Sequence, residues 1–148
     1  MTEILPSTEI DAPPERVWEI LTDFEKYHEW NSFTVTAEGP FEVGSVIKLL
    51  VAFPNGQRLT TTHTIDSIRP PYEMCWRKLN FPLLLWSRRC QVIEPLDGER
   101  SRYLNREYFF GPLAPVANYF YGRQVHRGLD EMAAALKQRA EERNNRGS

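Results

Sequence analysis

The feature that most constrains this chain's fold is a run of strand-like segments followed by one long amphipathic segment. Between residues 33 and 110, six short runs favour β-structure, and Pro, Gly and Asn turn signals separate them. Residues 113–142 instead repeat apolar side chains at helical spacing, which predicts one long helix. One helix covers only part of the apolar face of such a sheet. The order therefore predicts a curved sheet that grips the helix, with an apolar cavity between them.

The N-terminal part predicts a strand and two short helices. Residues 3–10 alternate as a half-buried strand does. Pro13 and Pro14 suit the first turn of a helix, because the N–H that proline lacks has no helical partner there. Asp23 can cap a second short helix that ends near Trp30. We therefore predict an α+β fold, with six to seven antiparallel strands, two short helices after strand one and a long C-terminal helix.

Length and charge limit the domain organisation and the partners. The 148 residues fit one domain, which we assign to residues 1–142, and residues 143–148 read as a disordered polar tail. A net charge of −2 lacks the basic field that nucleic-acid binding requires. No apolar run is long enough for a membrane span, and the polar N-terminus differs from a signal peptide, which predicts a cytoplasmic protein. The sequence leaves open whether the protein is a monomer or a homodimer.

The two cysteines, Cys75 and Cys90, do not have CxxC spacing. We interpret them as a buried pair of free thiols, with a disulfide as the alternative. The histidines, cysteines and carboxylates form no cluster with metal-ligand spacing, so we expect no metal. The chain also lacks the GxSxG, P-loop and GxGxxG motifs, so we expect no cofactor.

Four stretches carry a family resemblance that runs nearly from end to end of the chain. They are STEIDAPPERVWEILTDFEKYHEWNSF, DSIRPPYEMCWR, VIEPLDGERSRYLNREYFFGPLAP and GLDEMAAALKQRAE. Together they resemble the START/birch-pollen-allergen superfamily, in its polyketide cyclase/dehydrase-like (SRPBCC) branch. The resemblance implies the helix-grip fold. It implies no single activity, because the branch includes cyclases, dehydratases, lipid and hormone binders, and chaperone co-activators.

The last strand-like segment places a carboxylate where the resemblance implies a cavity wall. Tyr103, Asn105, Glu107 and Phe109 share one face of this segment, and the resemblance makes that face the inward one. On the neighbouring strand the resemblance makes the face that carries Arg89 the inward one, which predicts an Arg89–Glu107 ion pair across the two strands. Desolvation would raise the pKa of Glu107 toward a range useful for proton transfer. The alternative is that Glu107 only neutralises Arg89 and holds the sheet together.

Two further side chains are candidates for chemistry. His63 shares a strand face with Leu59 and Thr61 and is the best-placed histidine for proton transfer, although a lone strand histidine is more often an ordinary surface or core residue. Tyr121 lies on the helix stripe, where its hydroxyl either reaches the cavity mouth or simply covers the sheet edge. The candidate catalytic residues are Glu107, Arg89, His63, Asn105 and Tyr121.

Strand parity and the helix stripe also predict the substrate-binding wall. Its expected residues are Trp30, Val35, Leu49, Val51, Trp76, Tyr103, Phe109, Val125 and Met132. The leading hypothesis is an enzyme that cyclises or dehydrates an apolar, polyketide-like substrate without a cofactor. One alternative is a non-catalytic carrier of a hydrophobic small molecule. The other is a chaperone-activator-like interaction module, which would contain little internal cavity.

Overall fold

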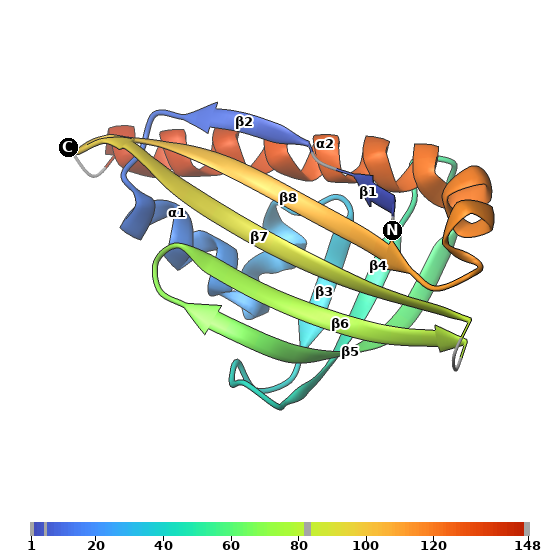
Figure 1. Cartoon of the computed structure of the whole chain (residues 1–148). Helices are drawn as coiled ribbons and strands as arrows, with labels where there is room; N and C mark the ends of the chain where they lie inside the picture. Colours follow the sequence, from blue (N-terminus) through green and yellow to red (C-terminus); the bar gives the residue numbers. More distant parts are fainter. Residues whose placement is uncertain (1, 5, 82–83, 147–148) are drawn as a thin grey trace.

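The computed structural model describes residues 2–4, 6–81 and 84–146 and shows a curved sheet beside one long helix (Figure 1). The elements in chain order are β1 (Thr2–Ile4), β2 (Ser7–Ile10), α1 (Pro14–Thr22), the 3-10 helix η1 (Phe24–Glu29), β3 (Thr34–Glu38), β4 (Val46–Ala52), β5 (Arg58–Arg69), β6 (Glu73–Phe81), β7 (Leu85–Asp97), β8 (Arg100–Phe110) and α2 (Ala114–Arg146). This is the predicted helix-grip architecture, with the two short helices where the sequence placed them.

The strands form one antiparallel sheet in the order β1-β8-β7-β6-β5-β4-β3. The strand predicted over residues 3–10 is divided in two, and both β1 and β2 pair with β8. Pro6 stands at the division, where its missing N–H cannot join the ladder, although its carbonyl still accepts a hydrogen bond from Asn105 N at 3.0 Å. The eight strands therefore occupy seven positions in the sheet, within the predicted number.

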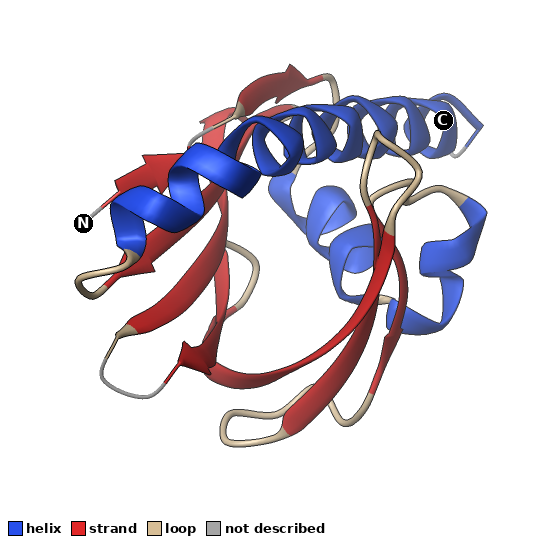
Figure 2. Ribbon diagram, turned by 90° about the vertical axis from the view of Figure 1, so that its right-hand side faces the viewer, coloured by secondary structure: helices blue, strands red, loops and turns tan. Residues whose placement is uncertain are grey.

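Helix α2 covers the open side of the curved sheet (Figure 2). From its middle onward the helix buries larger side chains, including Leu129, Met132 and Leu136, against the core. The inward positions near its start are Ala114 and Ala117, which are too small to fill the space beneath them. The helix thus seals one end of the sheet and leaves room at the other.

The C-terminal end of α2 differs from the sequence expectation. The helix continues to Arg146, four residues beyond the predicted end at residue 142. Of the segment expected to be a disordered tail, residues 143–146 are helical, and residues 147–148 lie outside the described part of the chain. No helix in the described part of the chain is long and apolar enough to cross a membrane.

A disulfide joins Cys75 on β6 to Cys90 on β7, which corrects the interpretation of these residues as free thiols. The two residues are direct partners in the β6–β7 ladder, so their side chains leave the sheet on the same face. The sequence could not reveal this register. The disulfide lies on the outer face of the sheet, because Trp76 and Arg89, which alternate with the cysteines, point inward.

Candidate functional site

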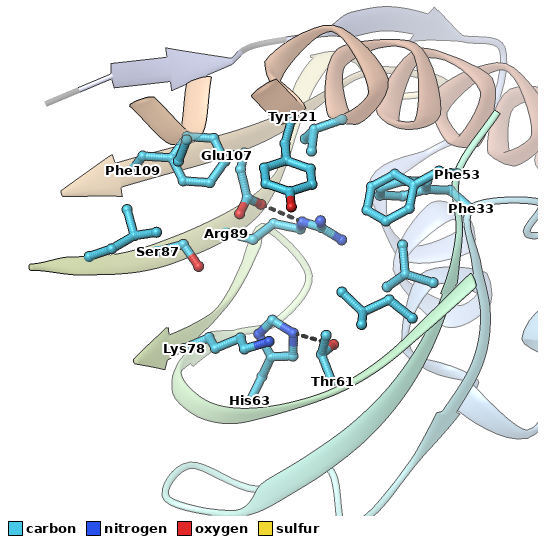
Figure 3. Close-up of a pocket in the computed structure, with 15 residues that line it drawn as sticks. Phe33, Phe53, Thr61, His63, Lys78, Ser87, Arg89, Glu107, Phe109 and Tyr121 are labelled. Carbon is cyan, nitrogen blue, oxygen red and sulfur yellow. Dashed lines mark hydrogen bonds and ion pairs between the residues drawn. The ribbon is translucent and has the colours of Figure 1, made fainter. Parts of the chain in front are cut away.

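A cavity of about 280 Å³ opens between the first turns of α2 and the inner face of the sheet (Figure 3). Its wall is mostly apolar and contains a small polar group. The lining residues are Phe33, Val51, Phe53, Leu59, Thr61, His63, Lys78, Leu85, Ser87, Arg89, Glu107, Phe109, Ala117, Tyr121 and Val125. Leu59 and Tyr121 line the cavity and are also exposed, so they mark its mouth. The size is near the lower end of the range for small-molecule pockets, ~300–1,000 Å³.

Arg89 and Glu107 form the predicted ion pair on the cavity wall. They are direct partners in the β7–β8 ladder, and Arg89 Nε donates to Glu107 Oε2 at 2.7 Å. Their side chains are only 8% and 9% exposed. Burial raises the pKa of the Glu107 carboxyl above its usual range, and the positive charge of Arg89 opposes that rise.

The guanidinium of Arg89 also rests on two aromatic rings. Its Cζ lies 5.4 Å from the ring centroid of Phe33 and 5.9 Å from that of Trp76. These cation–π contacts help a buried cation to hold its position without further carboxylates. Within the described part of the chain, the buried Nη1 of Arg89 has no hydrogen-bond partner. This leaves a cationic N–H donor unused on the wall of the cavity.

His63 supplies a neutral imidazole to the same cavity. Its Nε2 lies 2.9 Å from Thr61 Oγ1, and its ring is 6.1 Å from that of Trp76. Burial, assisted by the positive charges of Arg89 and Lys78, lowers the pKa of His63 to about 3. The imidazole is therefore uncharged at neutral pH. Its buried Nδ1 has no hydrogen-bond partner among the described residues.

Tyr121 and Lys78 complete the polar group. Tyr121 descends from α2, and its hydroxyl is directed toward the Arg89–Glu107 pair (Figure 3). Lys78 comes from β6 on the opposite wall. Burial lowers the pKa of the Lys78 ammonium, while the charge of Glu107 acts against that shift.

Asn105, a predicted catalytic residue, lies below the cavity rather than on its wall. Its Nδ2 donates to the Tyr103 hydroxyl at 3.0 Å and contacts Met132 Sδ at 3.7 Å. Tyr103 in turn donates to Gln91 Oε1 at 2.6 Å, and burial raises the pKa of its hydroxyl. These groups form a polar network in the core beneath the Arg89–Glu107 pair.

The structure places only part of the predicted apolar wall at the cavity. Val51, Phe109 and Val125 line the cavity as predicted. Leu49, Trp76, Tyr103 and Met132 point inward but are fully buried, because the C-terminal half of α2 and the short helices pack onto them.

Two residues of the predicted wall lie outside the cavity altogether. A register shift between Thr34 and Thr36 turns Val35 toward a surface hollow beside η1. Trp30 follows η1 and packs on Tyr27, with ring centroids 5.2 Å apart, near the C-terminal half of α2.

Several wall residues were missed, although the alternation of strand side chains pointed to them. Lys78, Ser87 and Phe53 each stand two residues along a strand from a residue that was predicted to point inward. The other missed residues are Phe33, Leu59, Thr61, Leu85 and Ala117. Among the residues that the structure describes, no three His, Cys, Asp or Glu side chains gather as a metal site would require.

Comparison with known proteins identifies the family. The family model described as "Polyketide cyclase / dehydrase and lipid transport" matches residues 1–141. The chain belongs to this family. No curated protein sequence matches the chain.

Solved structures of this fold include proteins named as aromatase/cyclases. The Zhui aromatase/cyclase from Streptomyces sp. R1128 superposes with a TM-score of 0.78 at 22% identity, covering 96% of this chain and 94% of that one. Norcoclaurine synthase from Thalictrum flavum gives 0.73 at 11% identity, covering 97% and 96%. The di-domain aromatase/cyclase BexL of the BE-7585A pathway gives 0.73 at 13% identity, covering 95% of this chain and 50% of that one. At these identities the likeness establishes the shared fold.

The cavity of this family member combines three chemical capacities. The apolar wall can hold and fold a hydrophobic molecule away from water. The unused N–H of Arg89 can bind an oxygen that carries negative charge. The Glu107 carboxyl, with its raised pKa, can exchange a proton.

Proposed function

We propose that this protein is a cofactor-free enzyme that cyclises or dehydrates a small hydrophobic molecule bearing several carbonyl groups. The observation that carries the proposal is the buried Arg89–Glu107 pair on an otherwise apolar wall, with Arg89 Nη1 unused. Arg89 lines the cavity, so a ligand oxygen can supply the acceptor that this donor lacks. The family and its aromatase/cyclase structural neighbours support the same class of chemistry.

Four polar residues have a role in this proposal. Glu107 removes a proton from the carbon between two carbonyl groups, and the resulting enolate oxygen is stabilised by Arg89 Nη1. The apolar wall bends the chain so that the enolate carbon bonds to a second carbonyl carbon, and the oxygen of that carbonyl becomes an alkoxide as its π bond breaks. Glu107 returns its proton to this oxygen to give a hydroxyl group. Loss of that hydroxyl, together with the remaining proton of the attacking carbon, releases water and leaves a carbon–carbon double bond. Tyr121 and the neutral His63 are within the same cavity to orient the carbonyl oxygens.

The test is a product assay on a synthetic poly-β-carbonyl thioester, with wild-type protein and the Glu107→Gln variant compared by mass spectrometry. Gln keeps the shape of Glu but cannot take up a proton at neutral pH. We expect turnover to fall by roughly 10²–10⁴-fold while the affinity for the thioester changes little. A melting curve of each protein separates loss of chemistry from loss of folded protein.

Asp66→Asn is the matched control. Asp66 pairs with Arg88 at 3.1 Å on the outer face of the sheet, so this variant removes a carboxylate from an arginine far from the cavity wall. It should leave turnover unchanged. Binding of the thioester without any product in wild-type protein would contradict the enzyme proposal and favour the carrier. Equal turnover in Glu107→Gln and wild type would contradict the role of Glu107.

A further inference from the structure

The start of α2 lies at the end of the molecule that faces the viewer in Figure 2. Several residues at the start of α2 and at adjoining strand ends have exposed apolar side chains. The mouth surface, as we call it, comprises Leu59, Leu79, Leu84, Val116, Tyr119 and Phe120. The most exposed are Tyr119, at 83%, and Phe120, at 68%. Their rings contact each other edge to face, with centroids 5.2 Å apart. Exposed aromatic clusters of this kind mark interaction sites.

Hydrogen bonds tie the parts of this surface together. Leu113 N, just before α2, donates to Leu84 O at 3.0 Å and so joins the helix start to the β6–β7 connection. Asn55 N donates to Gln124 Oε1 at 3.2 Å and joins the β4–β5 turn to the same helix. The apolar side chains are therefore held around one opening by the fold itself.

The charge of this end is cationic. The strand ends and connections at this end, residues 52–59, 78–81 and 84–88, and the following residues 110–127 contain no Asp or Glu. Arg58, Arg123 and Arg127 are exposed here, and none of them makes an ion pair within the described part of the chain. At the opposite end, by contrast, Arg100 and Arg102 are each paired with Glu9.

Apolar and positively charged side chains both lie along the outer face of α2. Val116, Phe120, Arg123 and Arg127 follow the spacing i, i+4, i+7 and i+11, which places them on one stripe of the helix. The stripe is apolar at the start of the helix and cationic in the next turns. Exposed apolar side chains can enter the boundary between headgroups and acyl chains of a bilayer, and arginines can contact anionic headgroups.

We propose that the mouth surface docks on an anionic lipid membrane, with the cavity mouth turned toward the bilayer. The apolar residues of the mouth surface enter the membrane interface around the cavity mouth, and Arg58, Arg123 and Arg127 contact the headgroups. An apolar ligand then moves between membrane and cavity without crossing bulk water. This proposal does not depend on what the cavity does to the ligand, so it stands or falls separately from the cyclase proposal.

The test is flotation of the full chain with vesicles of phosphatidylcholine alone, or with phosphatidylglycerol added. We expect binding only to the anionic vesicles, and weaker binding as salt rises. Each arginine removed should weaken binding roughly fivefold, so Arg123→Ala with Arg127→Ala should weaken it about 25-fold. Phe120→Ala should weaken binding on its own. None of these residues lines the cavity, and all are exposed, so the variants should keep the wild-type melting temperature.

Tyr72→Ala is the matched control, because Tyr72 is an exposed aromatic residue in the β5–β6 turn, away from the mouth. It should bind vesicles as wild type does. The proposal is overturned if wild-type protein fails to float with anionic vesicles, or if Phe120→Ala and Tyr72→Ala bind equally. A further contradicting result would be a wild-type protein that does not float and that forms a dimer by light scattering, with Phe120→Ala monomeric. That result would assign the surface to a second copy of this chain.

Discussion

At the scale of single residues, His63 shows how the cavity changes the state of a side chain. Its imidazole lies among Thr61, Trp76 and Lys78, where burial makes the charged form unfavourable. The pKa of His63 falls from 6.5 to about 3 as a result. A histidine held neutral in this way can orient a carbonyl oxygen but has little tendency to accept a proton. Glu107, whose pKa moves upward, is the better proton acceptor near neutral pH.

The pKa of His63 predicts a pH dependence of folding. Between pH 6.5 and about 3, the unfolded chain binds a proton at His63 that the folded chain does not. The free energy of unfolding is therefore fully retained above pH 6.5 and falls as the pH is lowered. From pH 7 to pH 5 this residue should cost up to about 2 kcal/mol. Urea denaturation at both pH values should show that His63→Gln loses this part of the dependence. The exposed His28→Gln should retain it, and identical pH slopes for His63→Gln and wild type would disprove the assignment.

At the scale of elements, the contact between α2 and the entry to β3 depends on a glycine. A Cβ at Gly128 would overlap the ring of Phe33, which is buried and lines the cavity. Phe33 also supports the guanidinium of Arg89, so its position matters for the site. The helix therefore accepts the poor helical propensity of glycine at this point in order to approach the sheet closely.

Gly128→Ala should destabilise the protein even though alanine favours helix. The helical gain is about 1 kcal/mol, but overpacking against a buried ring costs ~1–3 kcal/mol. We expect a net loss in the free energy of unfolding, measured by denaturant titration. Gly122→Ala is the internal comparison, because its Cβ meets only the exposed Asn118 side chain. That variant should be neutral or more stable by up to about 1 kcal/mol. A stabilised Gly128→Ala would mean that Phe33 moves aside freely.

The β6–β7 pair carries a second element-scale prediction. The Cys75–Cys90 disulfide closes a loop over a sequence separation of 15 residues. A loop of that size stabilises a fold by about 3 kcal/mol through the entropy of the unfolded chain. The double variant Cys75→Ala/Cys90→Ala should lose about this amount, while ligand binding persists because the disulfide lies on the face away from the cavity. Adding a reductant should lower the melting temperature of wild type and leave the double variant unchanged. No effect of reductant on wild type would contradict this prediction.

At the scale of the whole molecule, the cavity exists because α2 is unevenly packed. Leu129, Met132 and Leu136 fill the space between helix and sheet from the middle of the helix onward, whereas Ala114 and Ala117 leave it open near the start. Stability and ligand binding therefore belong to different halves of the same interface. The apolar mouth surface surrounds only the open half.

A larger side chain in the open half of the interface between α2 and the sheet should prevent ligand binding without unfolding the protein. Ala117→Leu places an isobutyl group into the cavity, where it contacts other wall residues instead of empty space. We expect affinity for an apolar fluorescent probe to fall at least tenfold and the melting temperature to stay level or rise. Val116→Leu, one position away on the exposed side, should bind the probe normally. Undiminished probe binding by Ala117→Leu would show that the probe occupies another site.

Local pattern in the sequence was enough to determine the order of elements and the curved sheet around a long helix, and the family resemblance indicated which faces of β7 and β8 point inward. Alternation along a strand and the period of a helix depend only on neighbouring residues, and register between adjacent strands then brought Arg89 to Glu107. The tertiary structure decided which inward residues line a cavity and which are buried in the core. Leu49 and Val51 share a face of β4, yet only Val51 meets the cavity. The difference arises because depth beneath α2 depends on packing between distant segments, which no local pattern contains.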